Sequence, residues 1–243
     1  MSYKLEVIAF TIESCAIIQQ SGAHRIELCD NATEGGTTPS YGMIKAAREK
    51  VSIDLFPIIR PRGGDFLYNE DEFKIILQDV KLCKQLGCDG VVIGLLNAHG
   101  SIDIKRTAQI IEAAQPMQVT FHRAFDRCKE PFEALEQLVQ LGCNRILTSG
   151  QQPLATEGAD LIAQLVKAAA ERIIIMPGSG VRKDNIKMLA DKTGAVEFHT
   201  SLRSYAKSKM DFIHPAFTTS EDSYRHPTVN GDEIKALLHA LNN

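Results

Sequence analysis

The chain lacks features that would assign it to a membrane or a nucleic acid. No apolar run approaches the roughly 20 residues that a membrane-spanning helix needs. Its 27 basic and 30 acidic residues give a net charge of −3 and are scattered along the chain, so no basic face is expected. We therefore expect a soluble cytoplasmic protein without a leader segment, a nucleic-acid partner or a membrane contact.

Several catalytic and metal motifs are also missing. The sequence contains no HExxH, DxDxDG or Walker motif. Its six cysteines form no CxxC pair, and in the absence of a leader we expect all of them to be free thiols. No lysine stands at the C-terminal end of a predicted strand, and Lys4 is at the beginning of the first one. This argues against a Schiff-base aldolase.

What the sequence does contain is a repeated alternation of short β-branched segments with amphipathic helical segments. The predicted strands are 4–10, 25–30, 54–61, 90–96, 117–125, 145–150, 172–178 and 195–201. Such alternation predicts a parallel sheet, and eight repeats in roughly 250 residues is the size of a (β/α)8 TIM barrel. We predict one α/β domain over residues 1–243. A doubly wound sheet is less favoured, because AFTIES after the first strand has no glycine.

Residues 203–231, between the last strand and the last helix, have no clear periodicity. A loop of this length in a compact domain is usually a lid, a subunit contact or a flap. Its position after the last strand predicts that it lies at the barrel mouth.

The alternation along the strands predicts a polar barrel interior. Apolar side chains such as Leu5 and Ile26 have the outward parity, and the inward parity carries Glu6, Glu27, Cys29, Arg60, Glu197 and His199. An unpaired charge inside a barrel is costly, so these groups must pair with one another or with a ligand. Glu27 and Arg60, on adjacent strands, are the expected pair. A purely structural ion network is an equal alternative.

The segment VTFHRAFD at 119–126 carries the strongest chemical signal. His122 stands at the end of the fifth predicted strand, where barrels do chemistry, and Arg123 and Asp126 follow it. Glycine-rich loops at 31–40 and 62–66 can let backbone approach a ligand, and they contain Glu34 and Asp65. PGSGV at 177–181, with HTS at 199–201, predicts either a phosphate cradle or a simple glycine turn.

These patterns predict two sets of residues at the mouth. The catalytic candidates are His122, Asp126, Glu27 and Glu34, and the substrate-binding candidates are Arg60, Arg62, Asp65, Arg123, Ser149, Gly178, Gly180, His199 and Ser201.

Together the motifs resemble the CutC family of cytoplasmic copper homeostasis proteins, which have a TIM-barrel fold. The matching motifs are PIIRPRGGDF at 57–66, TFHRAFD at 120–126, LTSGQ at 147–151, RIELC with EGGTTPS at 25–40 and GxGV at 178–181. The resemblance extends from Leu5 to about Ser201. It implies a copper-linked role, a homodimer and Cu(I) binding, for which Cys29 and His122 are the candidate ligands.

Three functional hypotheses follow. The first is a copper homeostasis protein that binds Cu(I) at the barrel mouth, since Cu(I) prefers thiolates. The second is an isomerase or lyase for a small anionic, perhaps phosphorylated, metabolite. Arg60 and Arg62 would bind the anion, and His122, oriented by Asp126, would move a proton with Glu27 or Glu34. The third is a barrel that serves only as a regulatory or scaffold surface.

Overall fold

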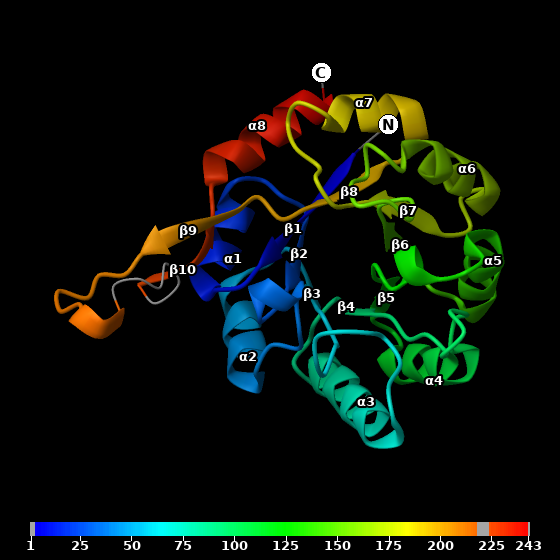
Figure 1. Ribbon diagram of the computed structural model, residues 1–243, viewed down its shortest axis with the longest axis horizontal. Coiled ribbons are helices and arrows are strands. Elements are labelled where there is room, and N and C mark those ends of the chain that lie inside the picture. The colour runs from blue at the N-terminus through cyan, green and yellow to red at the C-terminus, as the bar shows by residue number, and fades with distance from the viewer. Residues whose placement is uncertain (1–2, 218–223, 243) are drawn as a thin grey trace.

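The computed structural model describes residues 3–217 and 224–242 and has the architecture of a (β/α)8 barrel (Figure 1). The barrel strands are β1 Lys4–Ala9, β2 Arg25–Leu28, β3 Asp54–Pro57, β4 Gly90–Ile93, β5 Gln118–Phe121, β6 Arg145–Thr148, β7 Ile174–Pro177 and β8 Glu197–Thr200. All eight lie within the predicted segments, so the predicted fold class is confirmed. Each strand is shorter than predicted: all eight end before the predicted segment does, and β5, β7 and β8 also begin one or two residues later.

The strands pair in parallel as two four-stranded sheets, β3-β2-β1-β8 and β4-β5-β6-β7. A parallel bridge between Ile58 and Val92 joins the sheets just after β3, and β7 lies beside β8 on the opposite side. The sheet therefore closes on itself, and the ends of all eight strands meet at one mouth.

Helices surround the barrel (Figure 1). They are α1 Ile12–Gln20, α2 Tyr41–Lys50, α3 Glu70–Gln85, α4 Ile104–Ala114, α5 Pro131–Leu141, α6 Ala159–Ala169, α7 Ile186–Thr193 and α8 Gly231–Asn242. Gly142 and Gly194 end α5 and α7 in the left-handed conformation, as expected for C-terminal caps. In the part of the chain that the structure describes, no helix combines the length and the apolar character that crossing a bilayer requires.

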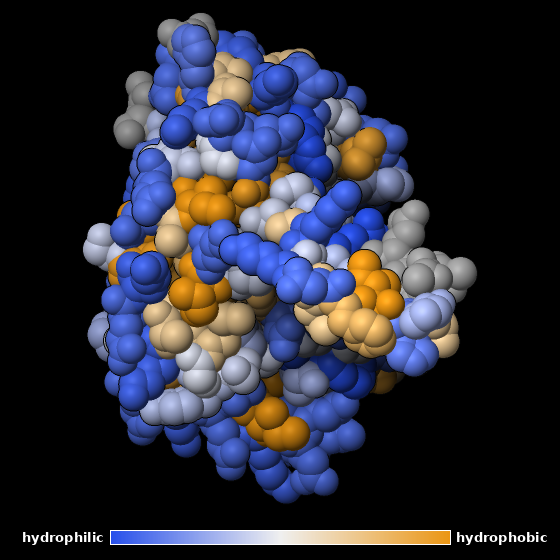
Figure 2. Space-filling view, turned by 90° about the vertical axis from the view of Figure 1, so that its left-hand side faces the viewer, coloured by the Kyte–Doolittle hydropathy of each residue, from blue (hydrophilic) through white to orange (hydrophobic). Residues whose placement is uncertain are grey.

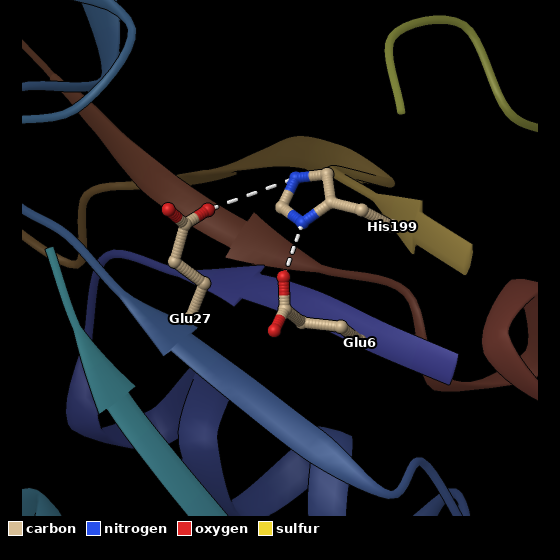
Figure 3. Close-up of side chains that lie close together, drawn as sticks. All are labelled: Glu6, Glu27 and His199. Atoms are coloured by element: carbon tan, nitrogen blue, oxygen red, sulfur yellow. Dashed lines mark hydrogen bonds and ion pairs between the residues drawn. The ribbon is translucent and has the colours of Figure 1, made fainter. Parts of the chain in front are cut away.

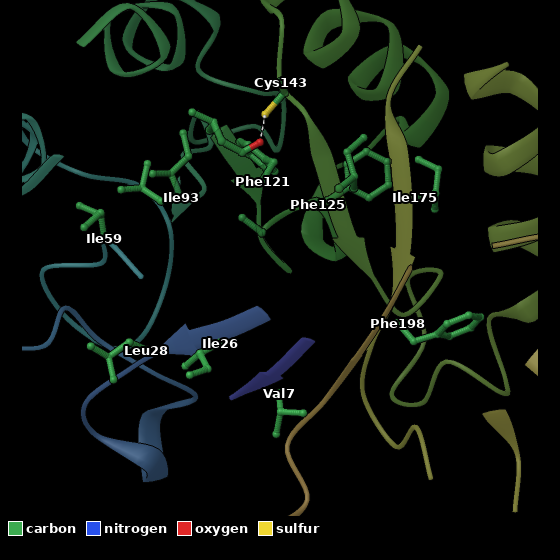
Figure 4. Packing of buried hydrophobic residues seen from close by; sticks show 14 of the residues in the cluster. Val7, Ile26, Leu28, Ile59, Ile93, Phe121, Phe125, Cys143, Ile175 and Phe198 are labelled. Atoms are coloured by element: carbon green, nitrogen blue, oxygen red, sulfur yellow. Dashed lines mark hydrogen bonds between the residues drawn. The ribbon is translucent and has the colours of Figure 1, made fainter. Parts of the chain in front are cut away.

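The main hydrophobic core lies between the strands and the helices. It includes outward-facing strand residues such as Val7, Ile26, Phe121 and Phe198, all without exposed surface (Figure 4). Their apolar partners come from the inner faces of the helices, for example Ile18 of α1. Burial of this apolar layer is the main favourable contribution to folding, and it confirms the predicted outward parity of the strands.

The barrel interior is filled by charged side chains. Arg25 of β2 donates from Nε to Glu6 of β1 and from Nη2 to Glu197 of β8, both over 2.5 Å. Glu197 also accepts from Arg145 of β6 over 2.7 Å. The ring of Phe56 lies under both guanidinium groups, 5.0 Å from the Cζ of Arg25 and 5.4 Å from that of Arg145. These ion pairs occupy the part of the barrel interior that lies below the mouth.

Residues 203–231 differ from the predicted loop. Two antiparallel strands, β9 Arg203–Lys207 and β10 Arg225–Val229, form an arm that projects sideways from the barrel (Figure 1). The sequence hides these strands because their alternation is between half-buried and exposed residues and so carries no apolar pattern. Figure 2 shows hydrophobic surface on the side of the molecule that bears the arm. The exposed apolar residues of the arm include Met210, Phe212 and Ile213.

We predict that Arg25→Met lowers the free energy of unfolding by about 3 to 5 kcal/mol, because it leaves two carboxylates buried without their shared cation. Urea unfolding followed by circular dichroism measures this loss. Arg172→Met is the matched control. It removes an exposed ion pair with Glu136 and should cost less than about 1 kcal/mol. Equal losses in the two variants would contradict a structural role for the interior network.

Candidate functional site at the barrel mouth

The strand register brings three ionisable side chains together above the interior network. Glu6 of β1 is paired in register with Arg25 of β2 on one side and with His199 of β8 on the other. Glu27 follows on β2, two residues nearer the mouth than Arg25 and on the same face. Glu6, Glu27 and His199 are all buried, and His199 lies between the two carboxylates (Figure 3).

His199 is oriented by Glu6. Its Nδ1 is 2.8 Å from Oε1 of Glu6, and its Nε2 is 3.7 Å from Oε2 of Glu27. Burial alone would lower the pKa of His199, but the hydrogen bond that its Nδ1–H donates to Glu6 and the charges of Glu27 and Glu6 raise it above its usual value. Glu6 itself stays ionised. Burial opposes this, but Arg25 and His199 lower its pKa to about 2.

Glu27 is the group that lacks a partner. Its only ion-pair contact among the described residues is the 3.7 Å approach of His199, which is too long for a hydrogen bond. Burial, and then the charge of Glu6, raise the pKa of Glu27 to about 7, against the influence of His199 and Arg25. Glu27 therefore changes its protonation near neutral pH beside a histidine with a raised pKa, which is the condition for acid–base catalysis.

Two small cavities lie at the mouth above this pair. The inner cavity has a volume of about 110 Å³ and is lined by Ile8, Glu27, Gly35, Ile58, Arg60, Phe66, His122, Arg123, Leu147 and His199. The outer cavity has a volume of about 160 Å³ and shares Ile8, Gly35, Arg123 and His199 with it, adding among others Gly180, Ser201 and Arg203. A larger hollow of about 660 Å³ lies outside the barrel, around Ile104 and Glu133, far from this chemistry.

Arg60 reaches the inner cavity from the end of β3, but it does not pair with Glu27. Its Nη1 donates to the carbonyl oxygens of Glu34 and Gly36, and its Nη2 donates to that of Gly64. The expected Glu27–Arg60 ion pair is therefore wrong. The glycine-rich loops, which curl back over the strand end, supply Arg60 with neutral acceptors instead.

His122 lies in the inner cavity but is not oriented by Asp126. Its Nδ1 accepts a hydrogen bond from the backbone N–H of Ala124 over 3.1 Å, so its proton is on Nε2, which has no partner among the described residues. Burial, and then the charge of Arg60, lower the pKa of His122 to about 3. His122 is thus a neutral hydrogen-bond donor. Gly94 makes room for its ring, because a Cβ there would lie 2.3 Å from it.

Asp126 organises the loop after β6 instead. It accepts from the hydroxyl of Thr148, from the backbone N–H groups of Ser149 and Gln151, and from Arg123 Nε. Arg123 also donates to the hydroxyl of Ser149 over 2.7 Å. The predicted role of Asp126 in orienting His122 is therefore wrong, because Thr148 and Ser149 lie nearer to its carboxylate. Arg123 remains at the mouth, and it lines both cavities.

Besides Asp126, Ser149 and Cys29, four further predicted residues line neither cavity. Arg62 pairs with Glu72 of α3 and with Asp65 on the outer surface, so both Arg62 and Asp65 stabilise a loop. Glu34 is exposed, and its side chain lies against Gly63. Gly178 makes room for neighbours, since a Cβ there would lie 2.4 Å from Leu147 and 3.3 Å from His199.

Cys29 follows β2 and is completely buried. Its neighbours are the apolar side chains of Ile8, Phe56, Ile58 and Val92. Burial, and then the charges of Glu27 and Glu6, raise the pKa of the Cys29 thiol well above its usual value. Among the described residues, the group of three side chains able to share a metal ion is Glu6, Glu27 and His199, which does not include Cys29.

Two features of the site were absent from the sequence interpretation. Arg25, which fixes Glu6, has the same inward parity as Glu27, so the alternation could have identified it. Phe66, which lies 4.9 Å from the ring of His122 and 5.0 Å below the Arg60 guanidinium, carried no signal because it follows the glycine-rich loop.

Comparisons with known proteins agree on one family. The sequence model of the CutC family matches residues 3–204. A family protein named CutC from Parabacteroides distasonis is 56% identical over 86% of each chain, and one from Chromobacterium violaceum is 48% identical over 98% of this chain and 97% of its own.

Solved structures extend the comparison. CutC from Streptococcus agalactiae, described as a candidate copper homeostasis protein, has a TM-score of 0.79 and 35% identity over 82% of this chain and 98% of its own. Phosphoribosylanthranilate isomerase from Thermotoga maritima, at 13% identity and a TM-score of 0.61 over 100% of this chain and 99% of its own, shares the fold alone.

The raised pKa of Glu27 predicts a specific dependence of stability on pH. Protonated Glu27 contributes stability that is complete below the ordinary pKa of 4.5 and is lost as the pH rises through about 7. Glu27→Gln removes this loss, so the variant should gain stability relative to the natural protein between about pH 5 and pH 8. Urea unfolding across this range measures the difference. Glu34→Gln, at an exposed carboxyl, should run parallel to the natural protein, and a parallel Glu27→Gln curve would contradict the raised pKa.

Proposed function

The chain belongs to the CutC family, and we propose that it is a copper homeostasis protein whose barrel mouth carries out acid–base chemistry on a small anionic metabolite. The acid–base part of this proposal rests on the environment of Glu27. It is a buried carboxyl with a pKa of about 7 and no hydrogen-bond partner among the described residues, and it faces a cavity beside His199. The reaction class is an isomerase or a lyase that moves a proton next to a carbonyl group.

Glu27 and His199 have complementary parts in this proposal. Ionised Glu27 removes a proton from the carbon next to the carbonyl group, and protonated His199 delivers one to the neighbouring atom. The hydrogen bond of His199 Nδ1 to Glu6 fixes the ring so that Nε2 faces Glu27 and the inner cavity. Because the pKa of Glu27 is about 7 and that of His199 is raised, Glu27 can accept and His199 can donate a proton near neutral pH.

His122 has a different part from the one expected from the sequence. With a pKa of about 3 it does not act as a base near neutral pH. Its Nε2–H is an unpaired buried donor, which suits it to hydrogen-bond the oxygen that gains negative charge when the proton is removed. In this proposal Glu27 and His199, and not His122, transfer the proton. His122 stabilises the negative charge instead.

The mouth does not fit Cu(I). The group able to share a metal ion offers two carboxylates and an imidazole, whereas Cu(I) prefers thiolates and thioethers. Cys29 is packed among apolar side chains, and its raised pKa disfavours the thiolate. We therefore propose that the link to copper is indirect. Direct Cu(I) binding by Cys29 and His122 is the second candidate, supported by family membership and by the position of Cys29 directly after β2.

We also propose a cytoplasmic homodimer, as the family resemblance implies. Exposed apolar side chains on the arm, among them Met210 and Phe212, support a contact with a second copy of the chain.

The acid–base proposal is tested by hydrogen exchange into metabolites. The protein is incubated with pooled small carbonyl compounds in D₂O, and deuterium incorporation is followed by mass spectrometry. We expect at least one compound to be labelled, and Glu27→Gln and His199→Asn to lower the rate by about 100-fold or more. Glu34→Gln should retain the rate. Labelling that survives both substitutions would overturn the assignment, as would a complete lack of labelling.

The copper proposal is tested by anaerobic titration of the reduced protein with Cu(I) against a competing chelator. If the link to copper is indirect, Cys29→Ser and the natural protein should bind the same small amount of Cu(I). Cys128→Ser, at another buried thiol, is the control. A tight stoichiometric site that only Cys29→Ser abolishes would establish the second candidate instead.

A further inference from the structure

Arg60 is a buried cation without a buried counter-ion. It is 6% exposed, and no carboxylate of the described residues lies within 4.0 Å of its guanidinium. Its three hydrogen bonds go to backbone carbonyl oxygens, and its Nε has no partner among the described residues. A buried charge that is only partly compensated is costly unless a ligand of opposite charge completes it.

A second unpaired donor lies beside Arg60. The Nε2–H of His122 is buried and has no acceptor among the described residues. Both side chains contact Phe66, whose ring centroid is 5.0 Å from the Arg60 Cζ and 4.9 Å from the His122 ring. Phe66 thus holds a cation and a neutral donor at one wall of the inner cavity, with Glu27 also on its lining.

We infer that the inner cavity binds a small monocarboxylate with a carbonyl or hydroxyl oxygen on the neighbouring carbon, that is, a 2-oxo or 2-hydroxy acid. The carboxylate faces Arg60, and the neighbouring oxygen accepts from His122 Nε2–H. This inference rests on the proposed function and names its substrate class.

The size of the cavity selects this class over phosphorylated metabolites, which are larger. The inner cavity of about 110 Å³ is well below the 300 Å³ or more of ordinary ligand pockets, so it suits a molecule of few atoms. A planar carboxylate matches the fork of a guanidinium group. The apolar side chains of Ile8, Ile58 and Leu147 line the same cavity and suit the carbon end of such an acid.

The experiment is calorimetric titration of the full chain at about pH 6.5 with four probes, pyruvate, glycolate, propionamide and glycerol 3-phosphate. We expect the two carboxylates to bind. The neutral amide and the larger phosphate ester should not bind. Arg60→Met should weaken pyruvate binding by about 10- to 100-fold. Arg62→Met is the matched control, since this arginine follows the same strand but lines neither cavity, and it should leave binding unchanged. If Arg60→Met does not fold, His122→Phe supplies the test, with an expected loss of about tenfold.

Three results would overturn the inference: propionamide binding as tightly as pyruvate, glycerol 3-phosphate binding in preference to both acids, or an equal loss in Arg62→Met. Failure of the proposed function is distinguishable from these. Pyruvate that binds through Arg60 while no compound exchanges deuterium leaves the carboxylate site standing and removes the catalysis. Deuterium exchange into a neutral compound, with no binding of either acid, removes the carboxylate site and leaves the catalysis.

Discussion

A guanidinium group with almost no exposure to solvent lies inside the barrel, held between carboxylates from two neighbouring strands. The negative charges of Glu6 and Glu197 keep Arg25 ionised, and the positive charge of Arg25 keeps Glu6 ionised. This mutual dependence fixes the side chain of Glu6, which in turn holds Nδ1 of His199. His199 then has only Nε2 to offer to the cavity. The reactive face of the mouth is thus set by an ion pair that itself lies below the cavity.

Burial has opposite effects on the two kinds of ionisable group at the mouth. It favours the uncharged form, so it raises the pKa of Glu27 and lowers that of His122. The charge of Glu6 adds to the shift of Glu27, although His199 and Arg25 oppose it, and the charge of Arg60 adds to the shift of His122. His199 escapes this trend because two carboxylates flank it. One low-dielectric site therefore contains a neutral donor, a poised carboxyl and a histidine that readily accepts a proton.

The sequence predicted the fold and the inward charges better than it predicted their partners. Alternation of period two identified Glu6, Glu27 and His199 as inward, because parity along a strand depends only on local geometry. The hydrogen-bond and ion-pair partners of these side chains depend on where the loops after the strands lie in space, and the local sequence does not determine this. Arg60 was assigned to Glu27, yet it binds loop carbonyl groups, and Asp126 was assigned to His122, yet it binds the loop after β6. The arm was missed because its strands carry no apolar alternation.

The chemistry of the mouth and the arm are separable. The family match ends at residue 204, and every residue of the inner cavity, from Ile8 to His199, lies before that point. CutC from S. agalactiae aligns over 98% of its own length but over 82% of this chain, so a shorter chain suffices for this barrel. The arm projects sideways from the barrel (Figure 1). Its first residue, Arg203, lines the outer cavity but not the inner one, which Glu27 faces. The described residues that surround Glu27 and His199 in the inner cavity therefore all belong to the barrel and its loops.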